Sequence, residues 1–161
     1  MSSRRILFVC TGNSCRSVMA ERYLRHVLQR AGIETVSVES AGVFAIDGMG
    51  PTSEAQRVLQ EAGIDCRDHR ARRLTAEMIQ AADLILVMEQ LHAEEIVRWR
   101  PSAKGKVQLL KGYSLSPEQV EGDPNIADPI GKPLEVYEVC FAQISEGVER
   151  VAKSLGVTSG L

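Results

Sequence analysis

Residues 5–17 read RILFVCTGNSCRS, an apolar run that leads directly into a polar loop with one glycine, two cysteines and an arginine. The run from Arg5 to Cys10 predicts a buried strand, because it is apolar from its second residue onward. From Ser17 onward apolar residues recur with helical spacing, and Gly32 predicts the end of that helix. The stretch therefore predicts a strand, a short loop and a helix in direct succession.

The same alternation continues along the rest of the chain. Strand-like runs cover residues 35–39, 84–88 and 106–110, and helical patterns follow at 53–62, 75–81, 90–99 and 134–155. Strands that alternate with helices predict a parallel sheet covered on both faces. Right-handed crossovers then predict an α/β, doubly wound fold with four parallel strands in the order 2-1-3-4 and helices on both faces.

Length and composition limit the class of protein. The chain has 161 residues, which fits a single domain over residues 1–161. A formal net charge of -2 provides no whole-protein attraction to nucleic acid or to anionic membranes. No apolar run is long enough to span a membrane, and the first one is too short for a signal peptide. We therefore expect a cytoplasmic protein, and the sequence does not determine its oligomeric state.

Four cysteines are present, and we expect them to be reduced thiols. A disulfide framework is unusual in a chain of this length without a secretion signal. One or two thiols with a chemical role fit better, and Cys10 and Cys15 lie in the loop described above. Cys66 and Cys140 are predicted to be ordinary core or boundary residues.

The loop at residues 10–17 has the residue types that hold a tetrahedral oxyanion. In a doubly wound sheet, ligands bind beyond the C-terminal ends of the strands, where the strand order reverses. A loop there presents free backbone N–H groups, and the helix dipole adds positive potential. Gly12 allows a positive φ or a close approach of the backbone to a ligand, and Asn13 tolerates the left-handed conformation. Arg16 adds a planar, two-pronged donor for phosphate oxygens.

Cys10 is positioned at the base of this loop as a nucleophile. Amide dipoles and an arginine stabilise a thiolate there, and Ser17 is placed to donate a hydrogen bond to it. A thiolate beneath a bound phosphoryl group is placed for in-line displacement, which gives a phosphocysteine intermediate. No metal and no cofactor is expected, because the loop itself neutralises the phosphate charge.

The leaving group needs a proton, and a carboxylate on the long polar segment before the last helix can supply it. The preferred candidate is Asp128, which precedes Pro129. The same group can then activate water against the thiophosphate ester. Asp123, which also precedes a proline, stays as the second candidate.

The chain resembles the low-molecular-weight protein-tyrosine phosphatases over nearly its whole length. Residues 10–17 match the C-x5-R-S loop of that family at its usual place near the N-terminus. The match continues in the same order through five further motifs: residues 19–21, 40–42, 69–72, 83–88 and 128–129. The loop pattern alone is moderately specific, and together with these motifs it becomes strong.

The resemblance implies a role for each matching residue. It implies that Cys10 is the nucleophile, Arg16 the phosphate clamp, Asp128 the general acid and Ser17 the partner of the thiolate. It implies a fold of the same α/β type and phosphorylated proteins as substrates. The remaining phosphate-binding loop residues would be Thr11, Gly12, Asn13, Ser14 and Cys15.

The resemblance also implies supporting residues. Asn13, Ser40 and His69 would brace the loop through hydrogen bonds. Cys15 matches a second loop cysteine that forms a reversible disulfide with the nucleophile in the family. The alternative for Cys15 is a small residue packed beneath the loop, and the two interpretations stand about even.

Two positions bear on which phosphorylated residue is cleaved. Family members specific for phosphotyrosine usually have a bulky aliphatic residue where this chain has Ser14, and aromatic residues after Asp-Pro, where it has Ile130. Residues 40–45, SAGVFA, are similar to the bacterial protein-arginine phosphatase branch, and the Ser14 hydroxyl can hydrogen-bond a guanidinium. Residues 69–72, HRAR, are more typical of the tyrosine branch. We favour phosphoarginine narrowly, with phosphotyrosine as the alternative.

Other functions fit less well. Thiol-dependent arsenate reductases share the fold and loop but need a further pair of cysteines, and residues 77–98 contain none. A phosphoprotein-binding module would lack the nucleophile or the acid, and a phosphocarrier domain has no need of Asp128. A zinc site formed by the pairs Cys10/Cys15 and Cys66/His69 would place Arg16 beside a cation.

Two further groups of residues receive no catalytic role. His26 and His92 lie on helical segments and are predicted to be at the surface or half-buried. The arginines at 67, 70, 72 and 73 form a basic cluster that is most simply a solvated turn. Its functional alternative is attraction of acidic surface near a phosphorylated site on a partner.

Overall fold

A four-stranded parallel sheet forms the centre of the computed structural model, which describes residues 3–158. Its strand order is β2-β1-β3-β4, as predicted, with every neighbouring pair parallel. The strands are β1 (Arg4–Cys10), β2 (Val36–Gly42), β3 (Leu84–Val87) and β4 (Val107–Leu109). The α/β, doubly wound prediction is therefore confirmed.

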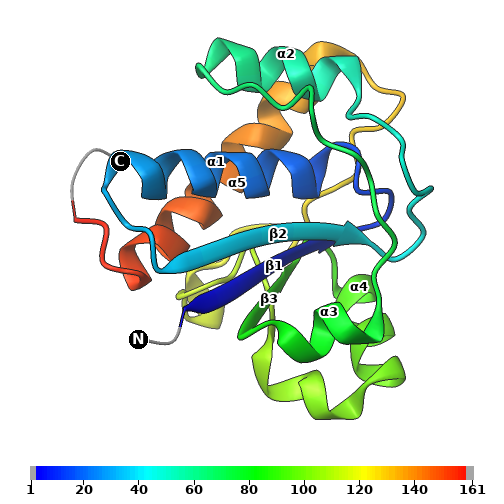
Figure 1. Ribbon diagram of the computed structural model, residues 1–161, viewed down its shortest axis with the longest axis vertical. Helices are drawn as coiled ribbons and strands as arrows, with labels where there is room; N and C mark the ends of the chain where they lie inside the picture. The colour runs from blue at the N-terminus through cyan, green and yellow to red at the C-terminus, as the bar shows by residue number, and fades with distance from the viewer. Residues whose placement is uncertain (1–2, 159–161) are drawn as a thin grey trace.

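Helices cover both faces of the sheet (Figure 1). On one face lie α1 (Arg16–Arg30), α2 (Ser53–Glu61) and α5 (Leu134–Ser154), and on the other lie α3 (Ala76–Ala81) and α4 (Gln90–Trp99). Two short 3-10 helices, η1 (Pro101–Lys106) and η2 (Pro117–Gln119), belong to the connections. No helix within residues 3–158 is long and apolar enough to cross a membrane.

Local signals in the sequence set the helix ends. The side chain of Thr52 accepts a hydrogen bond from the Ala55 N–H, and the side chain of Thr75 accepts one from the Met78 N–H. Such caps satisfy N–H groups that the first turn of a helix leaves free. Gly63 follows α2 with a φ of +79°, a conformation that favours glycine after a helix.

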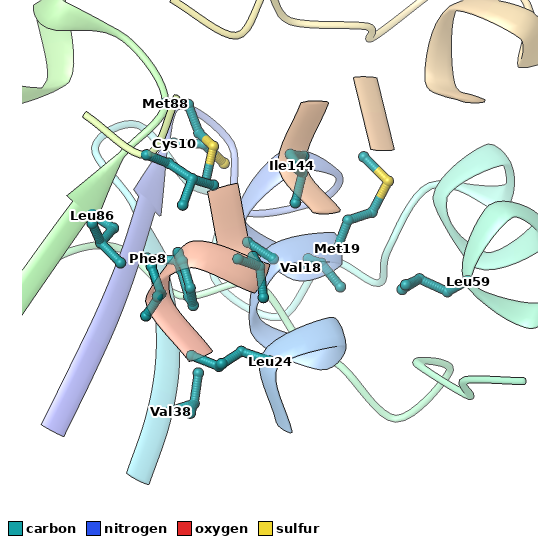
Figure 2. Close-up of a cluster of buried hydrophobic side chains, with 14 of the residues drawn as sticks. Phe8, Cys10, Val18, Met19, Leu24, Val38, Leu59, Leu86, Met88 and Ile144 are labelled. Carbon is teal, nitrogen blue, oxygen red and sulfur yellow. The ribbon is translucent and has the colours of Figure 1, made fainter. Parts of the chain in front are cut away.

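Alternate residues of β1 face opposite layers of the core. Phe8 and Cys10 face α1 and α5, where they pack with Leu86 and Ile144, as Figure 2 shows. Leu7 and Val9 face the other layer and pack with residues of β3 and α4. Burying one such side chain stabilises the fold by roughly 1.5–3 kcal/mol.

The C-terminal end of the sheet positions the site. Cys10 pairs with Gly42 in the β1–β2 register, so the loops after both strands begin side by side. In the close-up of Figure 2, Cys10 lies at the end of β1, next to Met88, which follows β3. The loop at residues 10–17 is therefore held by a buried strand on one side and by the start of α1 on the other.

Candidate active site

The loop at residues 10–17 is anchored to the segment after β2. The Val43 N–H donates to the carbonyl of Cys10 (3.0 Å), and the Phe44 N–H donates to that of Thr11 (2.9 Å). Gly42 is required by this close approach: a Cβ there would lie 2.5 Å from the Thr11 carbonyl oxygen. Any larger residue at position 42 would push the loop away from β2.

The left-handed position of the loop is Asn13 rather than Gly12. Asn13 has a φ of 53°, and Gly12 is not among the positive-φ glycines. A Cβ at Gly12 would meet only the Ser14 Oγ, at an ordinary 3.5 Å. Gly12 therefore does not adopt the positive φ that the sequence allowed for it, because its neighbour takes up the turn, and its close approach to a ligand stays a prediction.

Two donors converge on the Cys10 thiol, which is 1% exposed. The Asn13 backbone N–H lies 3.3 Å from Sγ, and the Ser17 Oγ lies 3.0 Å from it. Ser17 Oγ also accepts from the Asn13 side-chain amide at 2.8 Å, which directs the Ser17 hydroxyl hydrogen towards the sulfur. Hydrogen bonds from both sides stabilise a negative charge on Sγ.

A buried polar network braces Asn13. Its side-chain amide donates to Ser40 Oγ (2.9 Å), and Ser40 in turn donates to Glu21 (2.8 Å). The His69 Nε2 donates to the Asn13 carbonyl at 2.8 Å, and burial lowers the pKa of His69, which favours its neutral form. The structure thus brings together the three residues expected to brace the loop.

Two further residues of this network, Glu21 and Arg72, were not predicted from the sequence. Glu21 is 4% exposed and receives the Ser40 hydroxyl, and the Arg72 backbone N–H donates to Asn13 Oδ1 at 3.0 Å. Both residues lie within motifs that carried the family resemblance. A carboxylate on the buried face of α1 was the signal available for Glu21, because such a group requires partners.

Arg16 is held firmly at Nη1 and more loosely along its opposite edge. Its Nη1 donates to Glu89 Oε2 (2.6 Å) and to the Ile126 carbonyl (2.7 Å). Its Nε is buried and has no hydrogen-bond partner among residues 3–158. Nη2 makes only long contacts, 3.4 Å to Thr11 Oγ1 and 3.6 Å to Asp128 Oδ2. An oxyanion can therefore bind at the edge formed by Nε and Nη2, where a guanidinium offers two parallel hydrogen bonds.

Glu89 and His92 are site residues that the sequence analysis did not predict. His92 is 0% exposed, so the prediction that it lies at the surface or half-buried is wrong. Its Nδ1 accepts from the Glu89 N–H (3.1 Å), so Nε2 carries the hydrogen and donates to Thr11 Oγ1 (2.9 Å). Burial, followed by the charge of Arg16, lowers the pKa of His92 to about 4.

Asp128 lies at the rim of the loop and Asp123 does not. Asp128 Oδ2 is 3.6 Å from Arg16 Nη2, and its Oδ1 accepts from the Ile130 N–H at 3.1 Å. Asp123 instead accepts from the N–H of Asn125 within its own turn. Of the two candidate acids, only Asp128 contacts residues 10–17 in the described part of the chain.

Cys15 is the loop residue whose side chain lies next to Asp128. Its thiol is 3.8 Å from Asp128 Oδ1 and 4% exposed. Burial raises its pKa to about 12, and nearby Cys10 and Asp128 contribute in the same direction. Cys15 is therefore a neutral thiol beside a candidate nucleophile. Cys66 and Cys140 are buried in the core, as predicted.

The two positions expected to affect substrate choice differ in exposure. Ser14 is 9% exposed, and its carbonyl accepts a hydrogen bond from the Thr52 N–H. Ile130 is 55% exposed and follows Asp128 at the rim.

Residues 3–158 contain no group of three or more side chains that could hold a metal ion.

The arrangement can bind a tetrahedral oxyanion above a thiol. The donors available to such an anion are backbone N–H groups of the loop, the N-terminus of α1, which has no side-chain cap, and the unpartnered Nε of Arg16. The Cys10 sulfur lies below that position and the Asp128 carboxylate stands at its edge. The residues predicted to act as nucleophile, clamp and proton donor thus lie in one site.

Comparisons with known proteins agree with this geometry. Residues 5–159 match the model of a family described as low molecular weight phosphotyrosine protein phosphatase. The chain belongs to this family. It is accordingly an enzyme of the protein phosphatase class.

Relatives of this phosphatase include two kinds of protein. A protein-arginine-phosphatase of Geobacillus stearothermophilus is 42% identical over 94% of this chain and 95% of the relative. A probable low molecular weight protein-tyrosine-phosphatase, EpsP of Ralstonia nicotianae, is 39% identical over 91% of this chain and 92% of the relative. One solved structure is a YwlE arginine phosphatase, a cysteine-to-serine mutant with a phosphorylated active site serine. It matches this chain with a TM-score of 0.84 and 34% sequence identity, and the match covers 94% of this chain and 95% of that one.

Proposed function

We propose that this phosphatase hydrolyses phosphorylated protein side chains through a phosphocysteine intermediate formed on Cys10. The observation that carries the proposal is the pair of hydrogen bonds to the Cys10 sulfur, from Asn13 N–H and Ser17 Oγ, at the base of an anion-binding loop. The phosphorylated serine in the YwlE mutant supports it, because that protein carries its phosphate at the active-site position that a cysteine normally occupies.

In the first step, the Cys10 thiolate attacks phosphorus and the bond from phosphorus to the leaving atom breaks. Arg16 and the loop N–H groups hold the three equatorial oxygens, whose charge they neutralise. Asp128 gives its proton to the leaving oxygen or nitrogen. In the second step Asp128 takes a proton from water, the water oxygen bonds to phosphorus, and the sulfur leaves as a thiolate.

Phosphoarginine is the proposed substrate residue, with phosphotyrosine as the alternative. Ser14 places a hydroxyl in the loop where a bulky aliphatic side chain would favour a flat ring. Ile130 provides only one exposed aliphatic side chain at the rim, next to the proposed acid. The 42% identity to a protein-arginine-phosphatase supports the same choice, and the 39% identity to EpsP keeps the alternative open.

Cys15 is proposed to protect Cys10 from irreversible oxidation. Peroxide would convert the Cys10 thiolate to a sulfenic acid, and the Cys15 thiol would then displace water to form a disulfide. The two cysteines lie in one loop and influence each other electrostatically. A thiol reductant would restore both.

The test of substrate choice is kcat/KM on matched phosphoarginine and phosphotyrosine peptides, with Cys10→Ala as the inactive control. The proposal predicts a clear preference for phosphoarginine, and Ser14→Ile should shift activity towards phosphotyrosine. A preference for phosphotyrosine in the unmodified enzyme would refute the phosphoarginine assignment and leave the mechanism intact. Hydrolysis of neither peptide would contradict the proposed function.

A further inference from the structure

A hollow lies near the phosphate-binding loop, between α4 and the segments that follow β2 and precede α3. It has a volume of about 290 Å³ and is lined by Val43, Phe44, Arg73, Leu74, Glu95, Ile96 and Trp99. Its floor is buried, with Ile96 1% and Leu74 5% exposed, and its walls are not, with Phe44 63% and Trp99 46% exposed. We call this hollow the α4 groove.

Two segments that flank the α4 groove are hydrogen-bonded to the phosphate-binding loop. Phe44, at one end of the groove, donates its N–H to the Thr11 carbonyl, one residue after Cys10. The helix that forms the other wall contacts the same residue through His92. Figure 1 shows α4 below the arrowhead of β2, at the end of the sheet where the loop lies. A substrate chain that leaves the loop in this direction would pass the groove.

The charges around the α4 groove favour an acidic neighbour for the bound group. Arg73 is exposed and forms no ion pair within residues 3–158. The one carboxylate in the lining, Glu95, is paired with Arg98 at 3.2 Å. Asp47 accepts a hydrogen bond from the Arg73 backbone N–H at 2.8 Å, and Arg100 lies 5.5 Å from the centre of the Trp99 ring. The groove therefore combines an apolar interior with a cation, Arg73, whose guanidinium has no ion pair within residues 3–158 and so favours a carboxylate nearby.

We propose that the α4 groove binds a large apolar side chain of the phosphoprotein substrate, with an adjacent acidic residue paired to Arg73. The inference rests on the proposed function and adds a sequence preference to it. His92 and Trp99 are seven residues apart on α4, a rise of about 10 Å. That distance corresponds to about three extended residues, so the apolar residue is expected about three positions from the phosphorylated one.

The kinetic test uses phosphopeptides with phenylalanine placed two, three or four positions from the phosphorylated residue, beside aspartate. Replacing that phenylalanine by alanine should lower kcat/KM about tenfold, from lost apolar burial. Trp99→Ser should lower kcat/KM for the phenylalanine peptide to a similar degree and make the two peptides nearly equal. Arg73→Gln should lower kcat/KM for the aspartate peptide and bring it close to that of the matched asparagine peptide. This loss should be smaller than the one caused by Trp99→Ser.

Two controls separate this inference from the proposed function. Activity on a small aryl phosphate should be unchanged in Trp99→Ser and Arg73→Gln, since neither residue touches the phosphate. Val139→Ser, at an apolar position on α5 that is 61% exposed against 46% for Trp99, should leave peptide preference unchanged. An enzyme that is inactive on both aryl phosphate and peptides would overturn the proposed function, whereas active enzyme with equal kcat/KM for both peptides would overturn the groove alone.

A direct binding readout is available because Trp99 is the single tryptophan of the chain. In Cys10→Ala, the phenylalanine peptide should shift tryptophan emission to shorter wavelength at saturation, and the alanine peptide should shift it less. Emission that is unchanged by saturating phenylalanine peptide would contradict occupancy of the groove.

Discussion

Replacing Asn13 should destabilise the protein more than any other single change in the loop. The side chain makes three hydrogen bonds, to Ser17 Oγ, Ser40 Oγ and the Arg72 N–H, at 2.8, 2.9 and 3.0 Å. Each contributes about 1 kcal/mol to the free energy of unfolding. Alanine at a φ of 53° adds about 1 kcal/mol of backbone strain, so Asn13→Ala should cost about 4 kcal/mol.

Asn13→Gly separates the two contributions. It loses the same three hydrogen bonds but tolerates the left-handed conformation, so its cost should be about 3 kcal/mol. The measurement is urea unfolding at neutral pH, supported by thermal melts in which Asn13→Ala should lower Tm by about 8–16 °C. Both variants should also reduce kcat/KM, because the amide no longer directs the Ser17 hydroxyl towards Cys10.

The native protein should have the largest free energy of unfolding, Asn13→Gly a smaller one and Asn13→Ala the smallest. A loss below about 1 kcal/mol in both variants would show that the network does not hold the loop. Asn13→Ala at least as stable as Asn13→Gly would contradict the role given to the left-handed backbone.

Three further outcomes follow from the site. Asp128→Asn should slow poor leaving groups about 100-fold or more and good ones much less; a uniform loss across a leaving-group series would contradict the acid role. Cys15→Ser should make peroxide inactivation irreversible where the native enzyme recovers with a thiol reductant, and equal recovery would count against a Cys10–Cys15 disulfide. Burial lowers the pKa of His92 from 6.5 to about 4 in the folded protein. The contribution of neutral His92 to the free energy of unfolding is therefore complete above pH 6.5 and is lost as pH falls towards 4. Between pH 7 and 4.5 the native protein should therefore lose about 2–3 kcal/mol more than His92→Gln in urea unfolding, and parallel pH profiles would refute the assignment.

The fold was predictable because its signals are local. The apolar run before Cys10, the periodic apolar residues of α1 and α5, and the glycines and threonines at helix ends each determine one element. Strand alternation and right-handed crossovers then leave few topologies, and the order 2-1-3-4 is one of them. Element bounds differ from the predictions by a few residues, most clearly for β2, which continues to Gly42.

The site was predictable where one motif contains its residues and less so where the fold assembles them. Cys10, Arg16 and Ser17 share a loop, so their proximity follows from their spacing. Glu89 and His92 lie more than 70 residues further along the chain and reach the loop only through β3 and α4. A carboxylate directly after a predicted buried strand was the available signal for Glu89. His92 had no comparable signal, because a histidine near a helix start is ordinary.

Cys10 is proposed to carry the phosphoryl group during turnover, and trapping the phosphocysteine tests this. Asp128→Asn acting on an aryl phosphate with a good leaving group should form the intermediate normally and hydrolyse it slowly. Acid quench followed by mass spectrometry of the peptide containing Cys10 should then show phosphate on that cysteine, in an amount equal to the burst of released phenol. Phosphate on another residue, or a full burst with unmodified Cys10, would contradict the account.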